Sequence, residues 1–198
     1  MFTLYFNNIT TCNENIWQHP ELVNLALNSN IGLSMPQDAG KINLPQLSYL
    51  HLGNNSGAVP NSLGHKHFPT VVDLYLNSNT METLPTNFHT LKSTLSFLGV
   101  ANCGLKDLEG LDRFQGLVYL DARNNNISKL STEVKNMIKS DGFESYFSGN
   151  PICLTDDLNC NELCSDFCWS EKGFNDGYCD KTCDSSECSY DGGDCREV

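Results

Sequence analysis

The first three quarters of the chain repeat one nine-residue segment about every 24 residues. Apolar residues stand at places 1, 4 and 6 of LVNLALNSN, LSYLHLGNN, VVDLYLNSN, LSFLGVANC and LVYLDARNN. Place 9 is filled, at intervals of 25, 24, 24 and 22 residues, by Asn30, Asn55, Asn79, Cys103 and Asn125. Two weaker copies, FTLYFNNI and SYFSGNPI, put Asn7 and Asn150 at that place. Alternate side chains of a strand share a face, so places 4 and 6 should point into a core that stacked copies share.

This template resembles that of leucine-rich repeats, over about residues 1–152. The resemblance implies an α/β solenoid with a parallel sheet on its concave face. An asparagine at place 9 can donate and accept hydrogen bonds, so stacked copies should form a ladder that satisfies buried backbone groups. Cys103 is interpreted as a buried member of that ladder, and the alternative is a reactive thiol. Cys12 lies too many repeats away to pair with Cys103 and should be free, or paired with sequence upstream.

Both ends of the array carry their own signals. The first copy starts in mid-template at Phe2, which predicts exposed apolar surface and further repeats or a cap upstream. Near the other end, LSTEVKNMIKS predicts a helix with Ser131 as N-cap. Its inward-facing side chains should be those of Val134, Met137 and Ile138. A cap and linker are then expected over residues 153–163, where Cys153 could pair with Cys160.

Eight of the ten cysteines lie between Cys153 and Cys195. Such density indicates disulfides or zinc. The spacings do not form paired zinc knuckles, all five histidines precede residue 90, and the surroundings are acidic, so disulfides are favoured. Residues 151–198 contain twelve acidic and three basic side chains, and so hold −9 of the chain's net charge of −12. Disulfides place the protein in an oxidising compartment.

Residues 164–195, CSDFCWSEKGFNDGYCDKTCDSSECSYDGGDC, resemble the Notch (Lin/Notch) repeat over its whole length. The resemblance implies the disulfides Cys164–Cys188, Cys168–Cys179 and Cys183–Cys195, which sequence alone would leave open. It also implies a calcium site. Calcium prefers carboxylate and carbonyl oxygens, and so small a unit needs staples or a metal. The candidate ligands are Asp176, Asp191 and Asp194, with Asp184 as a weaker one. The alternative is a solvated acidic loop.

No apolar stretch is long enough to span a membrane. The N-terminus does not have the features of a signal peptide, which for a secreted protein suggests a processed or cropped chain. Three glycosylation sequons begin at Asn8, Asn54 and Asn126. The sequons, like the disulfides, indicate an extracellular protein. The acidic balance argues against nucleic acid and anionic membranes as partners.

No catalytic motif is present, so we expect a protein that is not an enzyme. The segment HKHF could bind a metal through His65 and His67, but a surface loop is the favoured interpretation.

Places 3, 5, 7 and 8 of the template should face outward, on the concave side of the sheet. There the sequence predicts an aromatic strip with charges beside it, formed by Tyr49, His51, Asp73, Tyr75, Phe97, Tyr119, Asp121 and Arg123. Exposed aromatic residues are typical of protein-binding surfaces, although aromatic residues also occur in strands merely to shield a sheet. The favoured function is extracellular recognition of a protein or peptide. An inhibitor of a secreted hydrolase and a structural surface or matrix protein are the alternatives.

Overall fold

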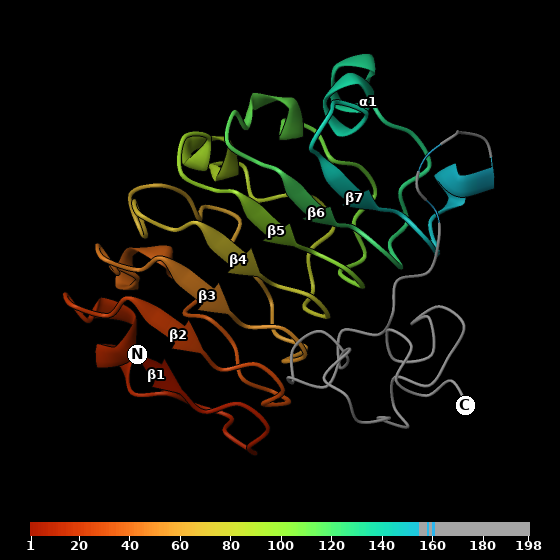
Figure 1. Cartoon of the computed structure of the whole chain (residues 1–198). Coiled ribbons are helices and arrows are strands. Elements are labelled where there is room, and N and C mark those ends of the chain that lie inside the picture. The colour runs from red at the N-terminus through yellow and green to blue at the C-terminus, as the bar shows by residue number, and fades with distance from the viewer. Residues whose placement is uncertain (155–157, 159, 161–198) are drawn as a thin grey trace, which may run out of the picture. The chain divides into compact units, whose positions relative to one another are not determined.

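The computed structural model describes residues 1–154, 158 and 160. The chain divides into two compact units, Met1–Asn159 and Cys160–Val198. The first unit contains a sheet of seven parallel strands in sequential order, which Figure 1 shows side by side. The strands are β1 (Phe2–Thr3), β2 (Asn24–Ala26), β3 (Tyr49–His51), β4 (Asp73–Tyr75), β5 (Phe97–Gly99), β6 (Tyr119–Asp121) and β7 (Glu144–Tyr146). Each strand falls in one copy of the repeated segment, so the predicted leucine-rich repeat solenoid is confirmed.

Short helices occur between most of the strands, and several of them form a second row beyond the strand ends (Figure 1). They are the 3₁₀ turns η1 (Glu14–Gln18), η2 (Ala39–Lys41), η3 (Phe88–Leu91) and η4 (Leu111–Arg113), the helix α1 (Thr132–Ile138), and η5 (Pro151–Leu154) after β7. In α1 the Ser131 hydroxyl caps the N-terminus by accepting from the Val134 amide. Val134 and Ile138 are buried, while Met137 is only half-buried.

The core is formed by the places that the template makes apolar. Strand register aligns Leu25, Leu50, Leu74, Leu98 and Leu120 at place 4, and all five are fully buried. Aromatic side chains also contribute to the core, where Phe68 and Phe88 are buried. Because one repeat presents only two or three of these side chains, the burial depends on stacking.

The asparagine ladder is present as the sequence predicts. Asn55 donates through Nδ2 to the carbonyls of Leu27 and Leu52, at 3.1 Å each, and its Oδ1 accepts from the Asn30 amide at 2.7 Å. Each amide therefore ties its own strand end to that of the preceding repeat. The same pattern recurs at Asn30, Asn79, Asn125 and Asn150.

The chain reverses direction after each strand through a residue in the left-handed conformation. Place 8 has a positive φ, between 52° and 72°, in all seven repeats: Phe6, Ser29, Asn54, Ser78, Asn102, Asn124 and Gly149. Asparagine and glycine tolerate this conformation best, which explains why they fill place 8 in four repeats. After the turn, the side chain at place 9 is buried and bonds to the backbone of the strand ends.

The first repeat departs from the pattern. Phe2, Leu4, Tyr5 and Phe6 are all exposed, as expected for a copy that is stacked on one side only. Asn7 keeps the period but is exposed, and its Nδ2 donates to Tyr5 within its own turn. No helix among the described residues is both long and apolar enough to cross a membrane.

Candidate binding surface

The concave face is the side of the sheet opposite the core, and two rows of side chains run across it. Strand register aligns the place 3 row as Asn24, Tyr49, Asp73, Phe97, Tyr119 and Glu144. It aligns the place 5 row as Ala26, His51, Tyr75, Gly99, Asp121 and Tyr146. The predicted strip therefore consists of neighbours in space that lie 22 to 24 residues apart in the chain.

The aromatic side chains of these rows form two groups. In the first aromatic cluster, Tyr75 contacts the rings of Tyr49 and His51, with centroids 5.8 and 5.3 Å apart. In the second, Tyr119 contacts Phe97 and Tyr146, with centroids 5.8 Å apart in each pair. The rings are half-buried rather than freely exposed, because each packs against the ring of a neighbour. Each ring therefore keeps an exposed side and is held in place by its neighbours.

Tyr146 is a member of this surface that the sequence-based prediction omits. It lies in β7 at place 5, opposite Asp121. The weak copy SYFSGNPI carries the signal, since Asn150 at place 9 sets the phase and places Tyr146 four residues before it. Extending the template to the last copy would have found it.

Two of the charges that the sequence predicts beside the aromatic strip, at the end of β6, are buried. Asp121 and Arg123 are only 2% and 8% exposed. They form a bidentate ion pair in which Arg123 Nε and an Nη nitrogen donate to the two carboxylate oxygens at 2.8 Å each. Buried charges persist in proteins when they are paired in this way. The two residues therefore stiffen the end of β6 instead of presenting free charges.

Asp73 is the contrasting acid. It lies in β4 and is half-buried, and its Oδ1 atom is buried without a hydrogen-bond partner among the residues that the structure describes. Burial raises the pKa of this carboxyl group above its usual value. Burial, together with the negative charge of Asp73, raises the pKa of Tyr49. The same two causes raise the pKa of Tyr75 to about 12.

His51 carries no charge at neutral pH. Burial lowers its pKa to about 4, and the Tyr49 hydroxyl lies 3.3 Å from its Nδ1. Burial also raises the pKa values of Tyr119 and Tyr146, which are therefore protonated. The first aromatic cluster thus presents neutral rings around Asp73.

The structure also corrects the interpretation of HKHF as a surface loop. His65 is exposed, but His67 is 1% exposed. The His67 Nδ1 lies 3.1 Å from both the amide and the carbonyl oxygen of Gly64, so the ring closes a local turn. Within residues 1–154, 158 and 160, no group of three or more potential side-chain ligands could hold a metal ion.

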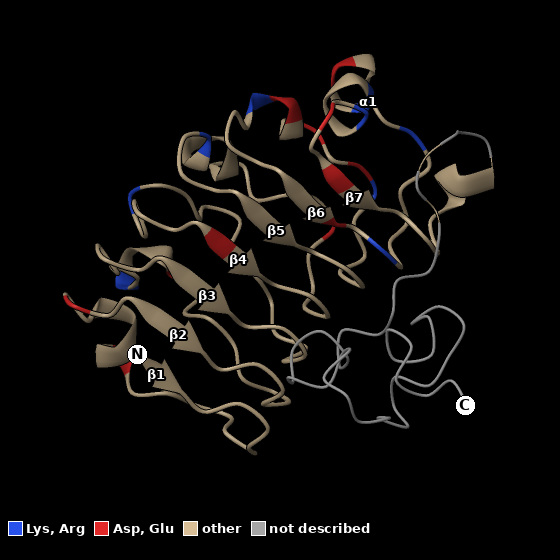
Figure 2. Ribbon diagram, viewed as in Figure 1, with Lys and Arg blue, Asp and Glu red and all other residues tan. Residues whose placement is uncertain are grey.

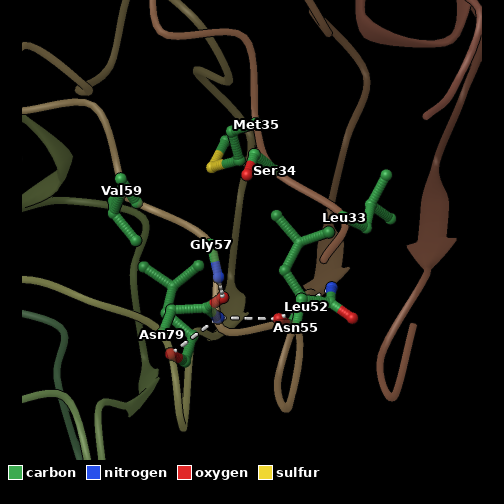
Figure 3. Close-up of a pocket in the computed structure, with 10 residues that line it drawn as sticks. Leu33, Ser34, Met35, Leu52, Asn55, Gly57, Val59 and Asn79 are labelled. Carbon is green, nitrogen blue, oxygen red and sulfur yellow. Dashed lines mark hydrogen bonds between the residues drawn. The ribbon is translucent and has the colours of Figure 1, made fainter. Parts of the chain in front are cut away.

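A small cavity between the second, third and fourth repeats belongs to the core (Figure 3). Its volume is about 10 Å³, room for about one water molecule. Leu33, Met35, Leu52 and Leu76 line it, together with the ladder residues Asn55 and Asn79. The Gly57 amide donates to Asn79 Oδ1 at 3.1 Å on its wall. This cavity is too small for a ligand.

The remaining predicted sites divide by position. The sequon residues Asn8, Asn54 and Asn126 are all exposed, and their glycosylation stays a prediction. Cys153 and Cys160 are both disulfide-bonded, and their pairing with each other also stays a prediction. The predicted calcium ligands and the other six disulfide cysteines lie outside the described residues: Asp176, Asp184, Asp191, Asp194, Cys164, Cys168, Cys179, Cys183, Cys188 and Cys195.

Comparisons with known proteins match both parts of the chain. Residues 158–196 match the family model of the Notch LNR domain. Over 105 residues the chain is 40% identical to leucine-rich repeat-containing protein 56 of Rattus norvegicus, which covers 52% of this chain and 16% of that protein. It is 32% identical over 104 residues to an uncharacterized leucine-rich repeat-containing protein of Schizosaccharomyces pombe, with the same two shares.

A third relative has the name of a phosphotransferase, and the match covers only a small part of it. The chain is 45% identical over 56 residues to the N-acetylglucosamine-1-phosphotransferase subunits alpha/beta of Homo sapiens, which is 28% of this chain and 4% of that protein. The matches thus span less than a fifth of the length of these relatives.

Proposed function

For a chain that joins a leucine-rich repeat solenoid to a Notch LNR domain, we propose a function in extracellular recognition, with a protein or peptide bound on the concave face. The observation that carries the proposal is the pair of aromatic clusters on that face. Half-buried tyrosine and phenylalanine rings supply large contact areas at a small cost in side-chain entropy, and such residues dominate protein-binding energies.

The placement of the rings favours an extended partner. The two clusters lie on neighbouring strands, from β3 to β7, so they form a row along the solenoid rather than a closed pocket. A peptide or a protruding protein segment that runs across the strands would contact both clusters at once. Binding rather than catalysis is therefore the proposed role.

The C-terminal module supports the extracellular part of the proposal. Eight cysteines within Cys153–Cys195 and the LNR match indicate a disulfide-stabilised unit, which needs an oxidising compartment. We propose that calcium stabilises this unit through Asp176, Asp191 and Asp194, because hard cations favour clustered carboxylates on flexible loops. The predicted boundaries remain residues 1–152 for the solenoid and 164–195 for the module.

Selection from a displayed library of random peptides tests the concave face. Peptides selected on the full chain should lose at least ten-fold in affinity for the variant Tyr75→Ala/Phe97→Ala, because each truncation removes an aromatic contact from one of the two clusters. Truncated anchor residues typically cost more than about 1 kcal/mol each, and 1.4 kcal/mol corresponds to ten-fold. Isothermal titration calorimetry would measure the loss.

The variant needs a stability control, because these rings are half-buried and not fully exposed as the sequence predicted. Met137→Ala, on α1, removes a half-buried side chain away from the concave face and should leave affinity unchanged. Circular dichroism would show that both variants are folded at the temperature used. Equal affinity of the selected peptides for the wild-type chain and the double variant would place binding elsewhere.

A further inference from the structure

Asp73 occupies the gap between the two aromatic clusters. In the place 3 row it stands between Tyr49 on β3 and Phe97 on β5, and Tyr75 follows it on the same side of β4. No ring contact joins Tyr75 to Phe97 in the part of the chain that the structure describes. We call these four residues the Asp73 subsite. It is an acid bordered by aromatic rings on three sides.

The carboxylate of Asp73 has no counter-charge in the described part of the chain. Its Oδ1 atom is buried and unpartnered, whereas the side chain as a whole keeps an exposed portion. The neighbouring Tyr49 hydroxyl lies against His51, which is neutral. A half-buried carboxylate without a counter-charge is costly, so a cation that reaches its exposed portion and donates a hydrogen bond there would bind favourably.

Glu144, in the same row as Asp73, has the same sign of charge. Figure 2 shows acidic residues on β4 and on β7, where Asp73 and Glu144 lie. Arg123 is the only cation at places 3, 5 and 7 of β2 to β7, and it is already held by Asp121. A cationic partner would be attracted to this face, and no unpaired positive charge at these places would repel it.

We propose that the Asp73 subsite binds an arginine or lysine side chain of the peptide segment on the concave face. The inference rests on the proposed function and specifies the partner's chemistry. A guanidinium or ammonium group can donate to the carboxylate while its flat or methylene portion lies on the rings of Tyr49, Tyr75 and Phe97. Charge-assisted hydrogen bonds and cation–π contacts strengthen each other at such a site.

A metal ion fits the subsite less well. Calcium takes six to eight oxygen ligands, and Asp73 is the one carboxylate among the four residues. An apolar side chain would leave the carboxylate unpartnered. The combination of one acid with three rings is suited to an organic cation.

A titration of the full chain with N-acetyl-arginine methylamide, followed by NMR of the aromatic rings, tests the proposal. The ring signals of Tyr49, Tyr75 and Phe97 should shift, and the neutral isostere N-acetyl-citrulline methylamide should bind at least ten-fold more weakly. Asp73→Asn should weaken arginine binding at least ten-fold. The matched control Glu144→Gln removes an exposed acid from the same row and should change it less than two-fold.

Three outcomes would overturn the proposal: equal binding of the two probes, no effect of Asp73→Asn, or no shift up to the solubility limit of the arginine probe. Peptides selected as above separate this failure from that of the proposed function. If they depend on Tyr75 and Phe97 but bind Asp73→Asn normally, the concave face is the binding surface and the basic subsite is wrong. If they depend on none of the three residues, both proposals fail.

Discussion

Cys103 shows how one residue can replace another within the ladder. Its Sγ atom donates to the carbonyls of Leu76 and Ala101, at 3.3 and 3.4 Å, where the other repeats use an asparagine amide. The side chain is buried, and burial raises its pKa to about 11. The thiol is therefore protonated at neutral pH and shielded from reagents. The ladder interpretation is confirmed over that of a reactive thiol.

Alkylation with iodoacetamide should label Cys12 in the native chain and Cys103 only after unfolding, because the thiolate is the reactive form and Cys103 is buried. Cys12 is free and half-buried, so it is an internal control in the same sample. Cys103→Asn should be tolerated, with a change in unfolding free energy within about 1 kcal/mol, since asparagine fills this place in the neighbouring repeats. Peptide mass spectrometry would follow the labelling. Labelling of native Cys103 at the rate of Cys12 would contradict its burial.

At the scale of the structural element, the turn after each strand decides whether a repeat can stack. Place 8 must adopt a positive φ, and in the last repeat it is Gly149, with φ 72°. A Cβ atom there would clash with Asn124 Oδ1, which belongs to the turn of the preceding repeat. Glycine is therefore required both by the backbone conformation and by the close approach of two turns.

Gly149→Ala should destabilise the chain by more than the roughly 1–2 kcal/mol that the left-handed conformation alone costs an L-residue. Gly142→Ala is the matched control, because Gly142 has φ 81° and nothing within 4 Å of the added methyl group. The difference between the two variants in unfolding free energy, measured by urea denaturation, reports the clash with Asn124. Equal losses would show that the turns move apart at no cost.

At the scale of the whole molecule, the two compact units have different sources of stability. The solenoid buries a continuous core of aliphatic side chains across its repeats. Residues 164–195 are few, acidic and rich in cysteine, so their stability should depend on disulfides and on a bound cation. The units should therefore respond differently when metal is removed.

Calorimetry of the oxidised full chain should detect one calcium ion, and Asp191→Ala should abolish its binding. At about 100 times the dissociation constant, calcium should add about 2.7 kcal/mol to the stability of the C-terminal module and almost nothing to that of the solenoid. Magnesium should substitute poorly, because it demands a tighter octahedral shell. Asp112→Ala, at η4 of the solenoid, is the control and should bind calcium normally. Unchanged calcium binding by Asp191→Ala would contradict the proposed site and favour the alternative of a solvated acidic loop.

The repeat period by itself determined the strands, their parallel register and the buried places 4, 6 and 9. Each depends only on the alternation of side chains along a strand and on the need of every copy to stack. The same phase predicted which residues of each strand face the concave side, Tyr49 and Tyr75 among them.

Only the tertiary structure decided how those outward residues meet. Asp121 and Arg123 neutralise each other, Asp73 Oδ1 has no hydrogen-bond partner among the described residues, and His67 is buried. Their places in the sequence pattern predict none of this. The reason is physical: burial and charge at these positions depend on neighbours from other repeats and on the local turn. A repeating pattern fixes which positions are adjacent, but the individual side chains determine whether adjacent groups pair, stack or remain open to a ligand.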